Sequence, residues 1–247
     1  MAGTYIKTKE NMETLAVETT TKIVSLALYK SDGGILKVDA DEGGQGVVMI
    51  FALLKNLLEM GGLLIKEISR VLVNVGPGDF TGTRVGVIFS KTVSLVIGVA
   101  LYGFNTLEVM ASFGETSEER VMIPVLDVRR GYYYFGGFRK SRSPENNGVH
   151  RLIRVFKPEL VKLDTLVSRL IEIPEEKMIL IQKDQIDSNL KDMFSKIGYF
   201  ESDLINAEGL ITAAQNFELS NRESDPHNIF PIYPSNFEMS LKETGKS

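Results

Sequence analysis

The chain has 247 residues, of which 43% are hydrophobic and 24% charged, and its formal net charge is −4 at pH 7. That length is ample for one large domain or two small ones with a buried core. The acidic balance argues against a protein that binds nucleic acid unaided, because such binding depends on neutralised phosphates. The lack of cysteine excludes disulfides, thiolate metal sites and a cysteine nucleophile, and fits the reducing cytoplasm.

The chain begins with a polar stretch, residues 1–11, which lacks the apolar core of a signal peptide and is expected to be a disordered extension. A strand is predicted at Leu15–Thr19. A hairpin of two more strands, Ile23–Tyr29 and Ile35–Ala40, follows around the turn Ser31–Gly34.

A helix is predicted at Val47–Met60, where apolar residues are dense and two glycines follow. The apolar run Val71–Val75 reads as a buried strand, and the helix Thr83–Ile97 and a short strand, Val99–Tyr102, come after it. The segment from residue 85 to 104 has the length of a membrane span, but Lys91 near its centre is costly in lipid. We therefore expect a buried helix in a soluble protein.

The second half repeats this theme with strands and then helices. Strands are predicted at Val121–Val128, Gly131–Phe138, His150–Phe156 and Met178–Ile181, helices at Pro158–Leu170, Asp187–Lys196 and Glu208–Leu219, and an exposed loop at Lys140–Asn147. Two α/β lobes fit this order. The expected units are a first lobe at 12–108, a second at 109–234, and a polar tail at 235–247.

The turn Gly76–Gly82 joins the predicted strand Val71–Val75 to the helix that follows it. Glycines at 76, 78 and 82 match neither a Walker loop nor the dinucleotide fingerprint. Asp79 would repel a phosphate there but would cap the helix well. So many glycines in one turn indicate a sharp bend or a close approach to a phosphate, a substrate or another backbone.

Small residues recur every four positions along the following helix and form one ridge. They are Gly82, Gly86, Ser90, Ser94 and Gly98. Such a ridge lets another element approach closely, either a helix of the same chain or a self-complementary surface of a dimer.

Metal and hydrolase chemistry have little support. His150 and His227 are the only histidines and are far apart in sequence, and no nucleophile elbow is present. Glu18 and Thr19 would touch metal and phosphate in a nucleotide-binding fold of this type, but an acid followed by hydroxyls is also ordinary turn chemistry.

Basic residues cluster in the sequence of the second lobe. They are Arg129, Arg130, Arg139, Lys140, Arg142, Arg151 and Arg154. They fit either a solvated sheet edge protected against strand pairing or a docking patch for RNA or an acidic partner.

Three segments together resemble the TsaB (YeaZ) family, bacterial accessory proteins for making threonylcarbamoyladenosine in tRNA. They are Leu15–Thr20, Gly76–Gly86 and Leu126–Gly131, the last followed by tyrosines, and Pro231-Ile232-Tyr233 resembles the family's closing Pro-x-Tyr. The resemblance covers nearly the whole chain, from residue 12 to 233.

The resemblance implies an α/β, actin-like and sugar-kinase-like (ASKHA) fold whose two lobes are each built on a ribonuclease-H-like mixed sheet. It implies a non-catalytic cytoplasmic subunit without metal or cofactor of its own. Such a subunit would form a homodimer in isolation and would pair through its first lobe with TsaD, the metal-bearing transferase. A TsaE ATPase would join the assembly, tRNA would be held through the complex, and ADP or ATP at the interface is left open.

The resemblance also places the partner interface on the glycine turn and its helix. The residues expected there are Gly76, Gly78, Phe80, Thr81, Gly82, Arg84, Gly86, Ser90 and Ser94. Glu18 and Thr19 are the candidates for a nucleotide contact.

Three departures from the family pattern bear on this expectation. Family members usually have aspartate at Glu18, and the longer acid weakens an inherited nucleotide role. They usually have serine at Asp79, and the aspartate disfavours an anion there. Many have a His-Ser-Glu run where this chain has Gly43–Gly46, so the family's usual contacts of that region are not expected to carry over. The alternative is an ATP-binding small-molecule kinase, for which the second lobe offers only Asp127. A metallopeptidase would need a histidine pair, and the lack of one in this chain argues against that activity. A homodimer with another regulatory role stays open.

Overall fold

A computed structural model describes residues 12–41, 46–114, 120–142, 150–183 and 188–234. The expected extension at 1–11, the expected tail at 235–247 and Gly43–Gln45 of the departure noted above lie outside these ranges.

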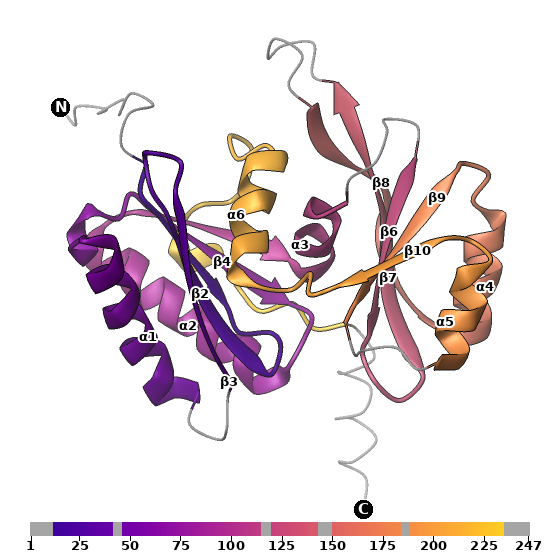
Figure 1. The fold of residues 1–247 in the computed structure, drawn as a ribbon, viewed down its shortest axis with the longest axis horizontal. Coiled ribbons are helices and arrows are strands. Elements are labelled where there is room, and N and C mark those ends of the chain that lie inside the picture. The colour runs from indigo at the N-terminus through magenta and orange to yellow at the C-terminus, as the bar shows by residue number, and fades with distance from the viewer. Residues whose placement is uncertain (1–11, 42–45, 115–119, 143–149, 184–187, 235–247) are drawn as a thin grey trace, which may run out of the picture.

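The first lobe is built on a five-stranded sheet, sheet A, in the order β3-β2-β1-β4-β5 (Figure 1). Its strands are β1 (Thr14–Glu18), β2 (Ile23–Tyr29), β3 (Ile35–Asp41), β4 (Arg70–Gly76) and β5 (Ala100–Asn105). The pairs β1–β2 and β2–β3 are antiparallel, whereas β1–β4 and β4–β5 are parallel. Helices α1 (Gly46–Gly61) and α2 (Phe80–Ile97) and a 3-10 turn (Ile65–Glu67) complete the lobe.

The second lobe contains a five-stranded sheet, sheet B, in the order β10-β9-β6-β7-β8. Its strands are β6 (Val121–Asp127), β7 (Tyr132–Arg142), β8 (His150–Lys162), β9 (Lys177–Gln182) and β10 (Tyr199–Ser202). Helices α4 (Leu163–Glu172) and α5 (Ser188–Ser195) belong to this lobe. The first three strands of each lobe are antiparallel and the last two join in parallel, so both lobes share one topology and the predicted actin-like, two-lobed fold is confirmed.

Helices α3 (Thr106–Ser112) and α6 (Ala207–Asn216) lie between the two sheets. They contribute to one hydrophobic core, which includes Phe104, Met110 and Leu210. A second core lies between sheet A and helices α1 and α2, and a third between sheet B and helices α4 and α5. The expected boundary after residue 108 falls within α3.

After α6 the chain returns to the first lobe and includes a 3-10 turn, Pro226–Asn228. Ser224 O accepts a hydrogen bond from Leu101 N at 3.1 Å, and Ile232 N donates to Val75 O at 2.7 Å. Residues 217–234 therefore act as a strap along sheet A, although the sequence placed them with the second lobe.

Several predicted elements differ from those observed. The helix expected from Pro158 begins only at Leu163, because β8 continues to Lys162. Proline is tolerated there since β8 is an edge strand and its register with β7 shifts between Phe135 and Gly137. The loop expected at 140–147 is wrong for its first three residues, which extend β7.

Two short elements, α3 and β10, were not predicted from the sequence. The sequence did hold a signal for α3: Asn105 and Glu108 form a capping box, in which Asn105 accepts from Leu107 N at 2.8 Å and Glu108 accepts from Asn105 N at 2.9 Å. Strand β10 has only four residues, Tyr-Phe-Glu-Ser, too few to show an alternation.

Helix α2 is long and apolar enough to cross a membrane, yet its inner face is buried against sheet A. Lys91 extends from α2 to the strap, where its amine lies 4.3 Å from the Phe230 ring centroid. This contact accounts for the charge in the middle of the apolar segment.

Candidate functional site

The glycine turn bends sharply between β4 and α2. Gly76 has a φ of +95°, which favours glycine, and a Cβ there would lie 2.9 Å from the carbonyl oxygen of Ile232 in the strap. The predicted cap is confirmed, because the Asp79 carboxylate accepts a hydrogen bond from Gly82 N at 2.8 Å.

The other glycines of the turn and helix leave space in which the β1–β2 turn of the same chain packs closely. Asp79 N donates to Thr20 O at 2.6 Å. A Cβ at Gly78 would overlap the Thr20 carbonyl oxygen, and one at Gly82 would overlap that of Thr19. Of the three candidates for the group that approaches these glycines, the structure supports protein backbone.

A buried polar network lies beneath this contact. The Glu18 carboxylate is fully buried and accepts hydrogen bonds from Thr20 N (2.5 Å), the Thr20 hydroxyl (2.7 Å) and Asn74 Nδ2 (2.6 Å). Burial raises the pKa of Glu18, while these hydrogen bonds act in the opposite direction. Asn74 Oδ1 accepts from Gly76 N at 2.9 Å, and the Thr106 hydroxyl donates to Pro77 O at 2.6 Å.

This geometry does not fit a phosphate at the glycine turn. Thr19 and Thr20 are buried, and the Glu18 carboxylate beneath them already has three donors. An incoming anion would have to separate the two turns and face Glu18. Within the described ranges no group of three or more His, Asp or Glu side chains is placed to hold a metal ion.

The small-residue ridge of α2 points into the protein. Gly82, Gly86, Ser90 and Ser94 are all buried, and a Cβ at Gly86 would overlap the Thr19 hydroxyl. The expectation that these four residues contact a partner is therefore wrong, because their own chain covers them. A turn at the end of β1 occupies the ridge near Gly82 and Gly86, in place of the helix considered as an internal partner.

The opposite face of α2 carries exposed apolar side chains that sequence reasoning missed. Ile88, Leu95 and Val96 are 64%, 50% and 78% exposed. Their spacing of seven and eight residues places them on one side of the helix. On the neighbouring helix α1, Phe51 is 59% exposed and its ring lies 5.3 Å from that of Phe89 on α2. The same spacing in the sequence could have identified this stripe.

Of the other five expected interface residues, Gly76 and Gly78 precede α2, the first buried and the second exposed. The other three lie at the start of α2. Thr81 and Arg84 are exposed and Phe80 is half-buried. The Arg84 guanidinium lies 3.8 Å from the Phe80 ring centroid and donates to the Tyr233 hydroxyl at 3.0 Å. The closing Pro-x-Tyr thus fastens the strap to α2.

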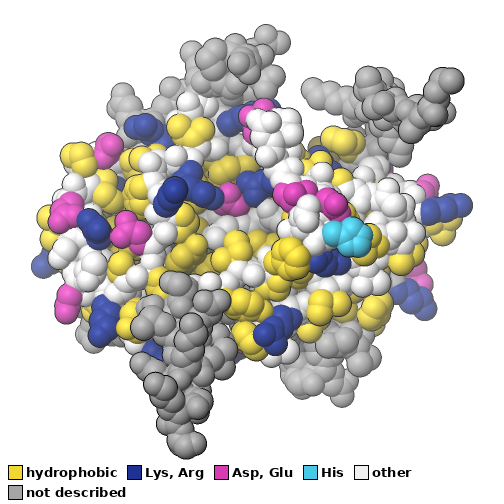
Figure 2. All heavy atoms as spheres, turned by 180° about the vertical axis from the view of Figure 1, so that it is seen from behind, with side chains coloured by type: hydrophobic (Ala, Val, Ile, Leu, Met, Phe, Trp, Pro, Cys, Tyr) yellow, Lys and Arg dark blue, Asp and Glu magenta, His cyan; other side chains and the backbone are white. Residues whose placement is uncertain are grey.

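The basic residues of the second lobe do not form one cluster. Arg129 and Arg130 occupy the β6–β7 turn, whereas Arg139 and Lys140 lie near the far end of β7. Arg154 pairs with Glu108 at 3.2 Å. Figure 2 likewise shows basic side chains dispersed among hydrophobic ones on the face that it draws. Asp127, the candidate catalytic acid of the kinase alternative, accepts from Arg129 N at 2.7 Å.

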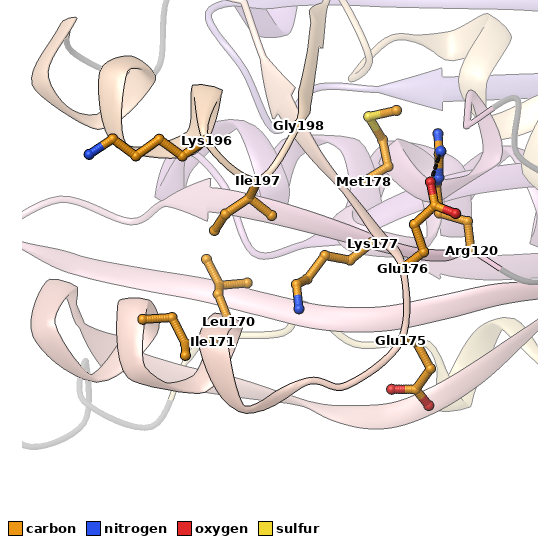
Figure 3. Close-up of a pocket in the computed structure, with 10 residues that line it drawn as sticks. All are labelled: Arg120, Leu170, Ile171, Glu175, Glu176, Lys177, Met178, Lys196, Ile197 and Gly198. Carbon is orange, nitrogen blue, oxygen red and sulfur yellow. Dashed lines mark hydrogen bonds and ion pairs between the residues drawn. The ribbon is translucent and has the colours of Figure 1, made fainter.

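A shallow pocket in the second lobe lies among the start of β9, the end of α4 and the α5–β10 connection (Figure 3). Some of its charged side chains already have partners, since Arg120 pairs with Glu176 and the Lys177 amine donates to Ile173 O. The pocket lies at the amino ends of the parallel strands, whereas ligands of such sheets bind at the carboxyl ends.

Comparison with known proteins identifies the family. The family model for TsaD, tRNA N6-adenosine threonylcarbamoyltransferase, matches residues 21–172, which is more than half of the chain. The chain belongs to the TsaD family. Within it, the chain is of the TsaB (YeaZ) type, on the basis of the relatives described next.

The tRNA threonylcarbamoyladenosine biosynthesis protein TsaB of Bacillus subtilis is 27% identical over 142 residues, which cover 55% of this chain and 62% of that protein. TsaB of Escherichia coli is 26% identical over 152 residues, 61% of this chain and 64% of that protein. The structure of YeaZ from Pseudomonas aeruginosa matches with a TM-score of 0.69 at 17% identity, over 90% of this chain and 99% of that one. The matched segment thus spans less than two thirds of the Bacillus and Escherichia proteins, while the YeaZ structure shows the fold over nearly its full length.

Proposed function

We propose that the chain is a non-catalytic accessory subunit for threonylcarbamoyladenosine modification of tRNA, and that it acts by pairing with a TsaD-like transferase. The family match and the names of the TsaB relatives support the pathway. The observation that carries the pairing is the exposed apolar face of α1 and α2.

This face has the composition of an interface. Ile88 and Val96 on α2 and Phe51 on α1 are each more than half exposed, and a shallow apolar groove along α1 is lined by Leu58 and Leu64 among others. Scattered apolar residues are normal on a surface, but exposed apolar side chains on two helices that meet at the Phe51–Phe89 ring contact favour a binding site. Full burial of each such side chain contributes about 1.5–3 kcal/mol. A homodimer in isolation would use the same face and compete with the TsaD-like partner.

The first-lobe turn supports a non-catalytic role. Its glycines are packed against the chain's own backbone, its Asp79 carboxylate caps α2, and the Glu18 carboxylate beneath it is buried and hydrogen-bonded. A nucleotide bound to this complex would accordingly be held by the partners or between them, and a TsaE-like ATPase would supply hydrolysis from outside this chain. The cytoplasm, where tRNA is modified, is the proposed location.

The experiment is to purify the chain with its host's TsaD-like subunit, measure complex formation by gel filtration, and assay tRNA modification with and without the chain. Ile88→Arg should abolish both pairing and activity, because it places a charge in the centre of the apolar face. Ile171→Arg is the matched control, since Ile171 is 72% exposed on α4 of the other lobe. Normal pairing of Ile88→Arg would refute the interface, and modification that does not need the chain would refute the accessory role.

A further inference from the structure

The β6–β7 turn holds two consecutive arginines in the left-handed region of backbone conformation. Arg129 has a φ of 71° and Arg130 a φ of 56°, and Gly131 follows at 74°. Residues other than glycine, asparagine and aspartate seldom adopt this conformation. Both arginines are exposed, so core packing does not explain why the sequence has them at these positions.

Backbone hydrogen bonds fix the shape of the turn. Arg129 N donates to the Asp127 carboxylate at 2.7 Å. Tyr132 N donates to Arg129 O, and Val128 N to Tyr132 O, both at 3.1 Å. The turn therefore presents its two side chains from a defined backbone.

The two guanidinium groups differ from several other arginines of the molecule, which have side-chain partners. Arg154 and Arg222 pair with Glu108, and Arg84 binds Tyr233. For Arg129 and Arg130, in contrast, the described part of the chain provides no side-chain ion pair or hydrogen bond.

Two lysines lie at the ends of neighbouring strands, on the same side of sheet B as the β6–β7 turn. Lys162 closes β8 opposite Tyr132, and its amine lies 5.8 Å from the centroid of that ring. Lys183 follows β9, the parallel neighbour of β6, and is exposed. Two acids at this end of the sheet have donors of their own, since Asp127 accepts from Arg129 N and Asp203 from Gln182 at 2.8 Å, whereas Asp164 at the start of α4 is exposed.

We propose that Arg129 and Arg130 bind the phosphate backbone of RNA, with Lys162 and Lys183 beside them. The planar guanidinium fork matches a phosphate in geometry and charge. The half-buried Tyr132 ring next to these cations offers a stacking surface, and that combination suits RNA better than an acidic peptide. Because the whole chain has a net charge of −4, we expect RNA to contact this group of cations and not the rest of the surface. The proposal rests on the proposed function in one respect, namely that the RNA is the tRNA being modified.

The test measures binding of labelled tRNA to the complex of this chain and its TsaD-like partner, by fluorescence anisotropy at several salt concentrations. The variant is Arg129→Asn with Arg130→Asn, because asparagine tolerates the left-handed turn and the fold is kept. Loss of two phosphate contacts should weaken binding and reduce the slope of log Kd against log salt by about 2. The control is Arg139→Gln with Lys140→Gln, which removes the same charge roughly 30 Å away along β7. It should leave the slope unchanged.

An unchanged slope in the asparagine pair would overturn the proposal, as would equal weakening by both pairs, which indicates general electrostatics only. Failure of the asparagine pair to join the complex, with tRNA binding by the isolated chain unaffected, would show that the turn binds an acidic protein surface and would also overturn it. Gel filtration of the unmodified chain with its partner comes first. If no complex forms, the proposed function fails, and titration of the isolated chain with tRNA at low salt decides the role of the turn by the same comparison.

Discussion

Gly86 and Ile88 lie two residues apart on α2 but face opposite sides, so substitutions at them should have opposite effects. A methyl group at Gly86 would overlap the Thr19 hydroxyl and lie 3.3 Å from Thr19 Cβ. That hydroxyl donates a buried hydrogen bond to Gly82 O at 2.7 Å. Thr19 can therefore make room only by giving up this bond.

The magnitude for Gly86→Ala follows from three contributions. Overpacking of a filled site costs about 1–3 kcal/mol, and the lost buried hydrogen bond costs about 1–3 kcal/mol. Alanine regains about 1 kcal/mol of helix propensity over glycine. The net loss is about 3 kcal/mol, which lowers Tm by about 6–12 °C for a chain of this size. Ile88→Arg should change stability by only about 0.5 kcal/mol, because the side chain is exposed.

The assay is thermal unfolding followed by circular dichroism, run beside gel filtration with the TsaD-like partner. Gly86→Ala should melt early and still pair at low temperature, whereas Ile88→Arg should melt normally and fail to pair. Adding Thr19→Ala to Gly86→Ala should cost less than the sum of the two single changes, because it removes the overlapping group. A Gly86→Ala protein with normal Tm, or strict additivity in the double variant, would refute this account of the ridge.

Two further predictions concern buried carboxylates. Burial raises the pKa of Glu18 above its ordinary value of 4.5, so the folded state keeps a proton that the unfolded state has lost, and stability falls as pH rises from that value through the raised pKa. Glutamine cannot ionise, so the Tm of wild type minus that of Glu18→Gln should fall with rising pH, and a difference that grows would contradict the shift. Glu108→Gln should cost about 3 kcal/mol in urea unfolding, because it leaves Arg154 and Arg222 without their shared, buried carboxylate. Glu218→Gln, which removes a half-exposed partner of Arg151, should cost less than about 1 kcal/mol. Equal losses in the two variants would contradict a larger contribution from the buried Glu108 ion pairs with Arg154 and Arg222.

The sequence by itself determined most of the elements and the architecture. Apolar alternation and turn residues are local signals, so the β2–β3 hairpin, the β4 strand and the Asp79 cap were predicted close to where they lie. The order of elements in each half was enough to predict two similar lobes. Elements with weak local signals were missed or misplaced, as with β10, which is too short to alternate, and with Pro158, which an edge strand tolerates.

Only the tertiary structure decided which face of α2 is free. A ridge of small residues indicates that another part of a protein packs closely against the helix. The sequence does not say whether that part belongs to a partner or to the same chain. The β1–β2 turn, some sixty residues earlier in the chain, occupies the ridge at Gly82 and Gly86, and this long-range contact leaves Ile88 and Val96 exposed instead. The same holds for the basic residues, since Arg130 lies in the turn before β7 and Arg139 near the other end of that strand, although they are close in sequence.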